Sequence, residues 1–404
     1  MEDYNPGFKS EHVYRLTPSD RIEVIEILTD AFGMQSEQGR SHFGFFIDSP
    51  VPKNYVIVRT EEGKMAAVLC LLDKACLFCG IPVEVTGLSY MGIATGFRDF
   101  SIRDLLVKGL FESISGNDRL LLGFARKKMD GFWYRFGFLG FTNFGRLSVE
   151  LRHLPALDTS LQFESCSPRD LPEIQNLYEG AYRGQPFLLK RTSADWATFF
   201  DRIKRLSLTL NAIKDAQQNM VGYVLLDREL FIEELAVLPD RWPQFASLIG
   251  RFFKTAQPTR THAEFGIGIT HPFSVYICNN YSYTFNTRFA WNGGHIMRIA
   301  SLQGFLQKML PVLTTRLANA LVSDFTVTVS DVMFVFRDGR LSFKLVKPKA
   351  DLSLAQLLHW QKMLFGTSDV SMLMFERPLP EPDISLLRIL FPVLNSQVPL
   401  IDQF

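Results

Sequence analysis

The chain contains an internal repeat, and this repeat restricts its fold more than any other feature. Residues 17–20 (TPSD) and 167–170 (SPRD) each place a hydroxyl side chain before a proline, with an acid three residues after the hydroxyl. This pattern is typical of a helix start, because the hydroxyl caps a free backbone N–H, the acid returns the hydrogen bond, and proline fits the first turn. Each copy follows a short strand-like run, at 13–16 and at 162–165.

Further segments recur at a similar spacing of roughly 150 residues. Residues 64–69 (KMAAVL) resemble 219–224 (NMVGYV), and residues 89–94 (SYMGIA) resemble 233–237 (EELAV). All four segments have the pattern of β-strands. In each copy the second strand is followed by a short polar stretch and then by an apolar helix. The order predicts two α/β domains of similar build. Chance similarity between short apolar patterns is the alternative.

The last part of the chain has a different pattern. Apolar residues from Leu302 onward predict a helix that kinks or ends near Pro311. Alternating residues on both sides of Asp338-Gly339 predict a β-hairpin, because this pair suits a two-residue turn with positive φ. We therefore expect a chain of class α/β (α+β) with three domains, at 1–154, 155–292 and 293–404.

Composition and charge exclude several classes of protein. The chain has 43 Lys and Arg against 42 Asp and Glu, a net charge of +1, so it lacks the basic surface of a typical nucleic-acid-binding protein. Its 36 Phe are not typical of a disordered chain. The longest apolar run, 65–72, is too short to span a membrane, and the first residues lack the features of a signal peptide. Five cysteines, an odd number, argue against a disulfide framework, and we expect a cytoplasmic protein.

The sequence gives no support to metal or hydrolase chemistry. Cys76 and Cys79 form a C-x-x-C pair, but no second Cys or His pair lies at ligand spacing. We therefore expect buried thiols on a strand or turn, with a functional pair as the alternative. No two histidines have the spacing of metal ligands, so no metal is expected. No hydrolase elbow, Walker or Rossmann pattern is present.

The features that point to chemistry lie in residues 84–138. A strand at 84–94 leads through a polar stretch into a helix, and a second strand at 120–124 precedes an aromatic segment. A strand that leads into a helix start is a general phosphate site, because free N–H groups point out of the first helical turn. Arg98 and Arg103 would add positive charge there.

This order resembles the core of the GCN5-related N-acetyltransferases, the GNAT superfamily. The three-domain layout with an apolar C-terminal end is similar to its Eis-like branch (enhanced intracellular survival). The resemblance implies two tandem mixed-sheet GNAT domains, the second degenerate, and then a domain similar to sterol carrier protein 2. It implies an acyl-CoA-dependent N-acetyltransferase that acts on an amine of a small molecule or a protein lysine. It further implies acetyl-CoA or another acyl-CoA as co-substrate, and a homo-oligomer.

The resemblance assigns the donor site to the first domain. The residues that would hold acyl-CoA through strand amides, the helix start or charge are Met91, Gly92, Ile93, Arg98, Ser101, Ile102 and Arg103. The family has glycine where this chain has Ser101, and a small residue where it has Arg103. In the second domain Pro243 removes an amide from the corresponding place, so we expect no CoA there.

The resemblance also points to catalytic and acceptor residues. The family's general acid is a tyrosine at the position of Trp133, which makes the neighbouring Tyr134 the candidate acid. The family's general base is the C-terminal carboxylate, here that of Phe404. The aromatic stretch after the first helix borders the acceptor site, so His42 and Phe45 join Trp133 as candidate substrate-binding residues.

Two other interpretations remain open. The missing loop glycine and tyrosine favour a catalytically inactive, GNAT-like scaffold or binding protein. The many phenylalanines favour an acyltransferase whose donor is a longer acyl-CoA or an acyl carrier protein. Glu84 and Glu234 lie on strands beside the proposed clefts and are alternative bases if they are buried.

Overall fold

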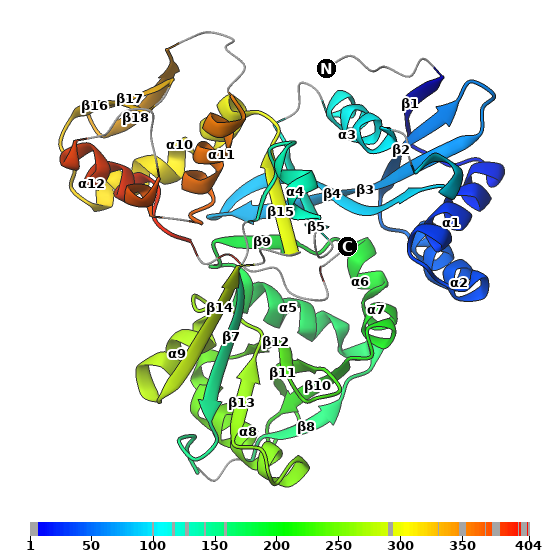
Figure 1. The fold of residues 1–404 in the computed structure, drawn as a ribbon. Helices are drawn as coiled ribbons and strands as arrows, with labels where there is room; N and C mark the ends of the chain where they lie inside the picture. The colour runs from blue at the N-terminus through cyan, green and yellow to red at the C-terminus, as the bar shows by residue number, and fades with distance from the viewer. Residues whose placement is uncertain are drawn as a thin grey trace.

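The computed structural model is an α/β fold with two mixed sheets and a third, smaller antiparallel sheet, as the sequence predicted (Figure 1). The residues that it describes are 7–98, 101–114, 118–125, 129–140, 143–156, 160–289, 294–329, 331–346, 353–367, 369–373, 380–394, 396 and 402. Within these ranges, no helix has the length and hydropathy needed to cross a membrane.

The first sheet lies between two layers of helices (Figure 1). Its strands, in spatial order, are β1 (Phe8–Val13), β2 (Lys53–Thr60), β3 (Met65–Phe78), β4 (Ile81–Ile93), β5 (Leu120–Ala125), β15 (Gly294–Ile299) and β6 (Leu139–Gly140), with β9 (Phe187–Lys190) paired to β3. Helices α1 (Pro18–Ala31) and α2 (Ser36–Asp48) cover one face, and α3 (Ile102–Ser113) covers the other. The short helix α4 (Asp130–Tyr134) follows β5.

The second sheet repeats this plan. Its strands, in spatial order, are β8 (Gln162–Ser165), β10 (Thr209–Lys214), β11 (Met220–Leu226), β12 (Ile232–Val237), β13 (His262–Phe265), β7 (Asn143–Glu150) and β14 (Tyr283–Phe289). Helices α5 (Leu171–Tyr182), α6 (Ser193–Ala197) and α7 (Phe199–Arg205) pack on one face, and α8 (Trp242–Ala256) and α9 (Pro272–Asn280) pack on the other.

The third sheet is joined to the first through its helices. It contains β16 (Phe325–Val329), β17 (Val332–Arg337) and β18 (Arg340–Leu345), and its helices are α10 (Leu302–Asn319), α11 (Leu354–Leu364) and α12 (Glu381–Leu390). One hydrophobic core joins these helices and strands to β5, β9 and β15. Short 3-10 turns lie at Thr95–Phe97, Pro168–Asp170, Pro239–Arg241 and Val370–Met372.

The first two sheets exchange strands. In the first sheet β15 lies between β5 and β6, and in the second sheet β7 lies between β13 and β14. Strand β7 therefore belongs to the second sheet, although it lies before the boundary expected at 154, and β15 belongs to the first sheet, although it lies after 292. Strand β9 lies within residues 155–292, but it pairs with β3 of the first sheet. The division into three domains remains a prediction. Strands β7, β9 and β15 each belong to a sheet on the other side of a predicted boundary.

Local sequence signals correspond closely to the structure. Thr17 and Asp20 form a capping box at α1, and Ser167 and Asp170 form the same box before α5. The hairpin turn at Asp338 and Gly339 has positive φ at both residues, +49° and +72°. Both helix starts and the hairpin are thus confirmed.

The helix from Leu302 was expected to kink or end near Pro311, and the second of these alternatives is wrong. Helix α10 continues through this proline to Asn319. Proline removes one backbone hydrogen bond from a helix. Apolar residues on both sides of it, Met309 and Leu313 among them, are buried in the same core, and this packing holds the two parts in one helix.

Gln361 ties the third part of the fold to the first sheet. Its side chain is fully buried, accepts a hydrogen bond from the Ile299 amide at 2.7 Å and donates one to the Gly137 carbonyl at 2.8 Å. We expect Gln361→Met to lower the free energy of unfolding by about 2–4 kcal/mol, because both backbone groups lose a buried partner. Urea denaturation measures this change. The control Gln303→Met, on the exposed side of α10, should change the free energy of unfolding by less than about 0.5 kcal/mol. An equal loss of stability in both variants would contradict the expectation.

Candidate functional site

Strands β4 and β5 separate partway along their length. Their parallel pairing joins residues 85–88 to residues 120–123. Beyond these pairs, among the described residues, β4 continues on β3 alone and β5 continues on β15. Backbone groups at the end of β4 that face β5 therefore have no strand partner and need another one. The predicted donor-binding residues Met91, Gly92 and Ile93 lie on this segment.

A β-bulge in β4 marks the point of separation. Ser89 and Tyr90 together lie opposite the single residue Cys70 of β3. A bulge bends its strand and increases the local twist, which turns β4 away from β5. At Gly92 a Cβ atom would lie 3.0 Å from the Cγ2 of Ile27, so the missing side chain lets α1 pack directly on β4.

Helix α3 begins after this segment and has no side-chain cap. Ser101 occupies the N-cap position without a side-chain hydrogen bond to the helix, and its carbonyl accepts the Asp104 amide. The first-turn amides of Ile102 and Arg103 point out of the helix start, an arrangement that favours anions. Ile102 is buried, whereas Arg103 is exposed and lies 5.7 Å from the Phe132 ring.

Arg98 is bound to α1. Its Nη2 donates to the Asp30 carboxylate at 2.6 Å, and the Thr95 hydroxyl donates to the same oxygen at 2.5 Å. Both members of the ion pair are about half exposed. Such a surface pair contributes only about 0–1 kcal/mol, so a phosphate that draws Arg98 away loses little stability. The predicted phosphate contact of Arg98 remains a prediction.

The two candidate aromatic residues of α4 point in different directions. The Trp133 side chain is 7% exposed and lies edge-on to Phe138 at 5.0 Å, in the core that α3 covers. Tyr134 is 48% exposed. Of the two, Tyr134 is therefore the side chain that reaches solvent and can exchange a proton with it. Its role as acid, and a substrate contact of Trp133, remain predictions.

The predicted acceptor residues lie where the two halves of the fold meet. The His42 ring and the Tyr90 hydroxyl are 2.9 Å apart, which connects α2 to the bulge in β4. The guanidinium of Arg205, on α7, lies 3.7 Å from the centre of the Phe45 ring. Burial, and then the positive charge of Arg205, lower the pKa of His42, so the ring is neutral at pH 7.

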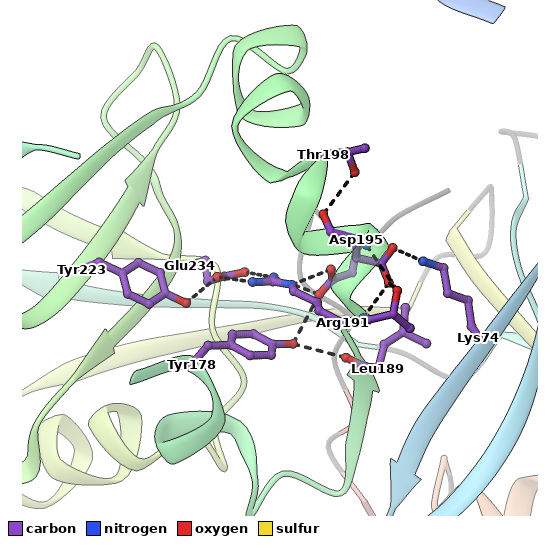
Figure 2. A network of polar contacts seen from close by, with 10 residues as sticks. Lys74, Tyr178, Leu189, Arg191, Asp195, Thr198, Tyr223 and Glu234 are labelled. Carbon is purple, nitrogen blue, oxygen red and sulfur yellow. Dashed lines mark hydrogen bonds and ion pairs between the residues drawn. The ribbon is translucent and has the colours of Figure 1, made fainter. Parts of the chain in front are cut away.

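A buried network with Arg191 at its centre occupies the same junction (Figure 2). Arg191 donates to the Glu234 carboxylate at 3.0 and 2.5 Å and to the Asp402 carboxylate at 2.8 and 3.0 Å. The Tyr223 hydroxyl donates to Glu234 at 2.6 Å, and the Tyr178 hydroxyl lies 3.4 Å from Asp402. Burial alone would lower the pKa of Arg191, but the two carboxylates raise it well above its usual value.

A second buried ion pair adjoins this network. Lys74 of β3 bonds to Asp195 of α6, and both side chains are almost fully buried (Figure 2). Burial lowers the pKa of Lys74, although Asp195 counteracts this effect. Asp195 also accepts hydrogen bonds from the backbone amide and the hydroxyl of Thr192, the N-cap residue of α6, in a capping box. The pair connects the first sheet directly to the helices of the second.

Sequence reasoning finds only part of this arrangement. Glu234 is buried, as its candidate role requires, but it is bound to Arg191, whereas Glu84 is exposed. Arg191 and Asp402 are not predicted, and the only signal for them is a charge beside an apolar run in each case. Phe404 lies outside the described residues, two positions after Asp402.

Comparison with known proteins supports the fold over the whole chain. No family model and no curated protein sequence matches it. Among solved structures, a GCN5-related N-acetyltransferase from Kribbella flavida is similar, with 13% identity, 99% of each chain covered and a TM-score of 0.61. Another from Anabaena variabilis has 14% identity, covers 98% of this chain and 100% of its own, and has a TM-score of 0.65. Eis1 from Mycobacterium abscessus has 12% identity, the same coverage and a TM-score of 0.64. The chain thus has the full-length fold of the Eis-like GNAT proteins, and the predicted fold is confirmed.

Because α7 lies close to α2, the charge of Arg205 is expected to affect the pKa of His42. We expect Arg205→Gln to raise the pKa of His42 toward 6.5, because the substitution removes a positive charge that disfavours the protonated ring. NMR titration of the imidazole signals measures this value. The control Arg228→Gln removes an arginine that bonds to Ser207 instead, and it should leave His42 unchanged. No shift in Arg205→Gln, or equal shifts in both variants, would contradict the proposed contact.

Proposed function

We propose that the protein is an acyl-CoA-dependent N-acyltransferase that transfers an acetyl group to an amine. The observation that carries this proposal is the separation of β4 from β5. Among the described residues it leaves strand amides without a strand partner, and the next helix, α3, starts without a side-chain cap. The similar structures from Kribbella flavida and Anabaena variabilis are named as N-acetyltransferases, and they support the same conclusion.

The donor binds along the end of β4. Backbone amides of residues 91–93 align the pantetheine arm and polarise the thioester carbonyl, so that negative charge developing on its oxygen is stabilised. The first-turn amides of α3 take the pyrophosphate. Arg98 and Arg103 then add charge to this site, with Arg98 exchanging Asp30 for a phosphate.

The acceptor approaches from the side of α2, past His42 and Phe45. The terminal carboxylate of Phe404 takes a proton from the amine, whose nitrogen then attacks the thioester carbon. The CoA thiolate leaves and takes up a proton from Tyr134 or from water. The acceptor is a small-molecule amine or a protein lysine, and the active protein is a homo-oligomer.

The second half binds no CoA. Pro243 lies in the first turn of α8, where it removes an amide from the place that corresponds to the start of α3. Only one parallel residue pair, Ile232 with Phe265, joins β12 to β13, so the second sheet keeps the strand separation without a complete helix start.

A scaffold without catalysis is the second candidate function. Two observations favour it: the buried indole of Trp133 stands at the family's tyrosine position, and Arg98 is occupied by Asp30. A donor with a longer acyl chain is a variant of the first candidate. Turnover measurements with acyl-CoA donors of increasing length separate these possibilities.

Ligand-dependent stability tests the donor site. At a CoA concentration one hundred times its Kd, we expect stabilisation of about 2.7 kcal/mol and a rise in Tm of roughly 3 °C. Arg98→Glu should abolish most of this rise, because it places a negative charge beside the phosphates. The control Asp30→Asn frees Arg98 without reversing its charge, and it should retain the rise.

Turnover tests the reaction itself. We expect release of free thiol from acetyl-CoA in the presence of a panel of amines, and Tyr134→Phe should lower kcat. The absence of any rise in Tm at millimolar CoA would contradict the donor site. A clear rise without turnover of any amine would favour the scaffold.

A further inference from the structure

Arg191 joins three segments that lie far apart in the sequence. It follows β9, the strand that pairs with β3 of the first sheet, while Glu234 belongs to β12 of the second sheet. Asp402 belongs to the C-terminal tail. The rings of Tyr178 and Trp196 lie 3.9 and 5.0 Å from the guanidinium carbon. A guanidinium with rings against its faces and carboxylates at its edges is fixed in orientation.

Among the described residues, three cations and three carboxylates form a connected cluster at this junction. Arg191 interacts with Glu234 and Asp402, and Arg202 and Lys74 each interact with Asp195 and Asp402. Glu234 alone is sufficient to neutralise Arg191. The side-chain carboxylate of Asp402 supplies the third negative charge. Its removal leaves an excess positive charge in a buried site, which is unfavourable.

The anchored residue is close to the end of the chain. Phe404 follows two positions after Asp402, so Asp402 is the described residue nearest in sequence to the terminal carboxylate. Arg202 is in electrostatic range both of Asp402 and of Tyr90 at the bulge of β4. Among the described residues, Asp402 is therefore linked through Arg202 to the bulge where β4 and β5 separate.

We propose that Arg191 is a positioning residue: it binds Asp402 and so holds the terminal carboxylate of Phe404 at the site where the amine is deprotonated. The second half of the fold, which has lost its own donor site, thereby anchors the base of the first. This inference rests on the proposed function for its catalytic part, whereas the anchoring of the tail is independent of it.

Digestion of the full-length protein with a carboxypeptidase tests the anchor. We expect Asp402→Asn and Arg191→Lys to release the last residues at least ten times faster than the wild type. Asparagine lacks the charge, and lysine cannot bond both carboxylates with a planar fork. The control Asp369→Asn removes an exposed carboxylate that pairs with Arg388, and it should leave the release rate unchanged. Equal release rates in all four proteins would overturn the proposal.

Steady-state kinetics tests the positioning role. We expect Asp402→Asn to lower kcat at least tenfold and to change KM for acetyl-CoA less than threefold, because the donor site is not touched. Removal of Gln403 and Phe404 keeps Asp402 and should cause a similar loss of kcat without a change in Tm. This second variant preserves the test if Asp402→Asn fails to fold.

The outcomes separate the two proposals. Faster tail release with unchanged kcat would overturn the positioning role while leaving the enzyme in place. A wild-type protein with a protected tail but without turnover of any amine would overturn the proposed function, and the positioning role with it.

Discussion

Arg191 is bound by two buried carboxylates, and the arrangement of the two halves of the fold depends on this interaction. Glu234 comes from the second sheet, Asp402 comes from the end of the chain, and the arginine itself follows a strand of the first sheet. A buried charge that loses its partner costs about 3–5 kcal/mol. The segments are therefore held together by these buried charges as well as by the core in which Leu188 of β9 packs with Ala236 of β12.

The exchange of strands reinforces the same junction. Strand β7 completes the second sheet and β15 completes the first, so neither sheet is built from one continuous segment. The helices that cover the third sheet share a core with β5, β9 and β15. The strands that separate, β4 and β5, are thus held by the exchanged strand β15 and by the core shared with the third sheet. Rigid support of this kind suits a site that must present backbone amides in a constant geometry.

The sequence predicts the features that are set by neighbouring residues. The capping boxes at Thr17 and Ser167 and the turn at Asp338 involve contacts within four positions, and the structure has all of them. Pairing between distant segments has no such local pattern, so the place of β15 and the bond from Arg191 to Asp402 were not predictable from the sequence. Helix α10 does not end at Pro311 for the same reason, because distant core contacts outweigh the local effect of proline.

The central claim is that only the first half holds acyl-CoA and that the second half serves as its support. Calorimetric titration of the full chain with CoA tests this claim most directly, because it counts the binding sites. The account predicts one CoA per chain. Two sites per chain would contradict the interpretation of the second half, and no binding at millimolar CoA would contradict the account as a whole.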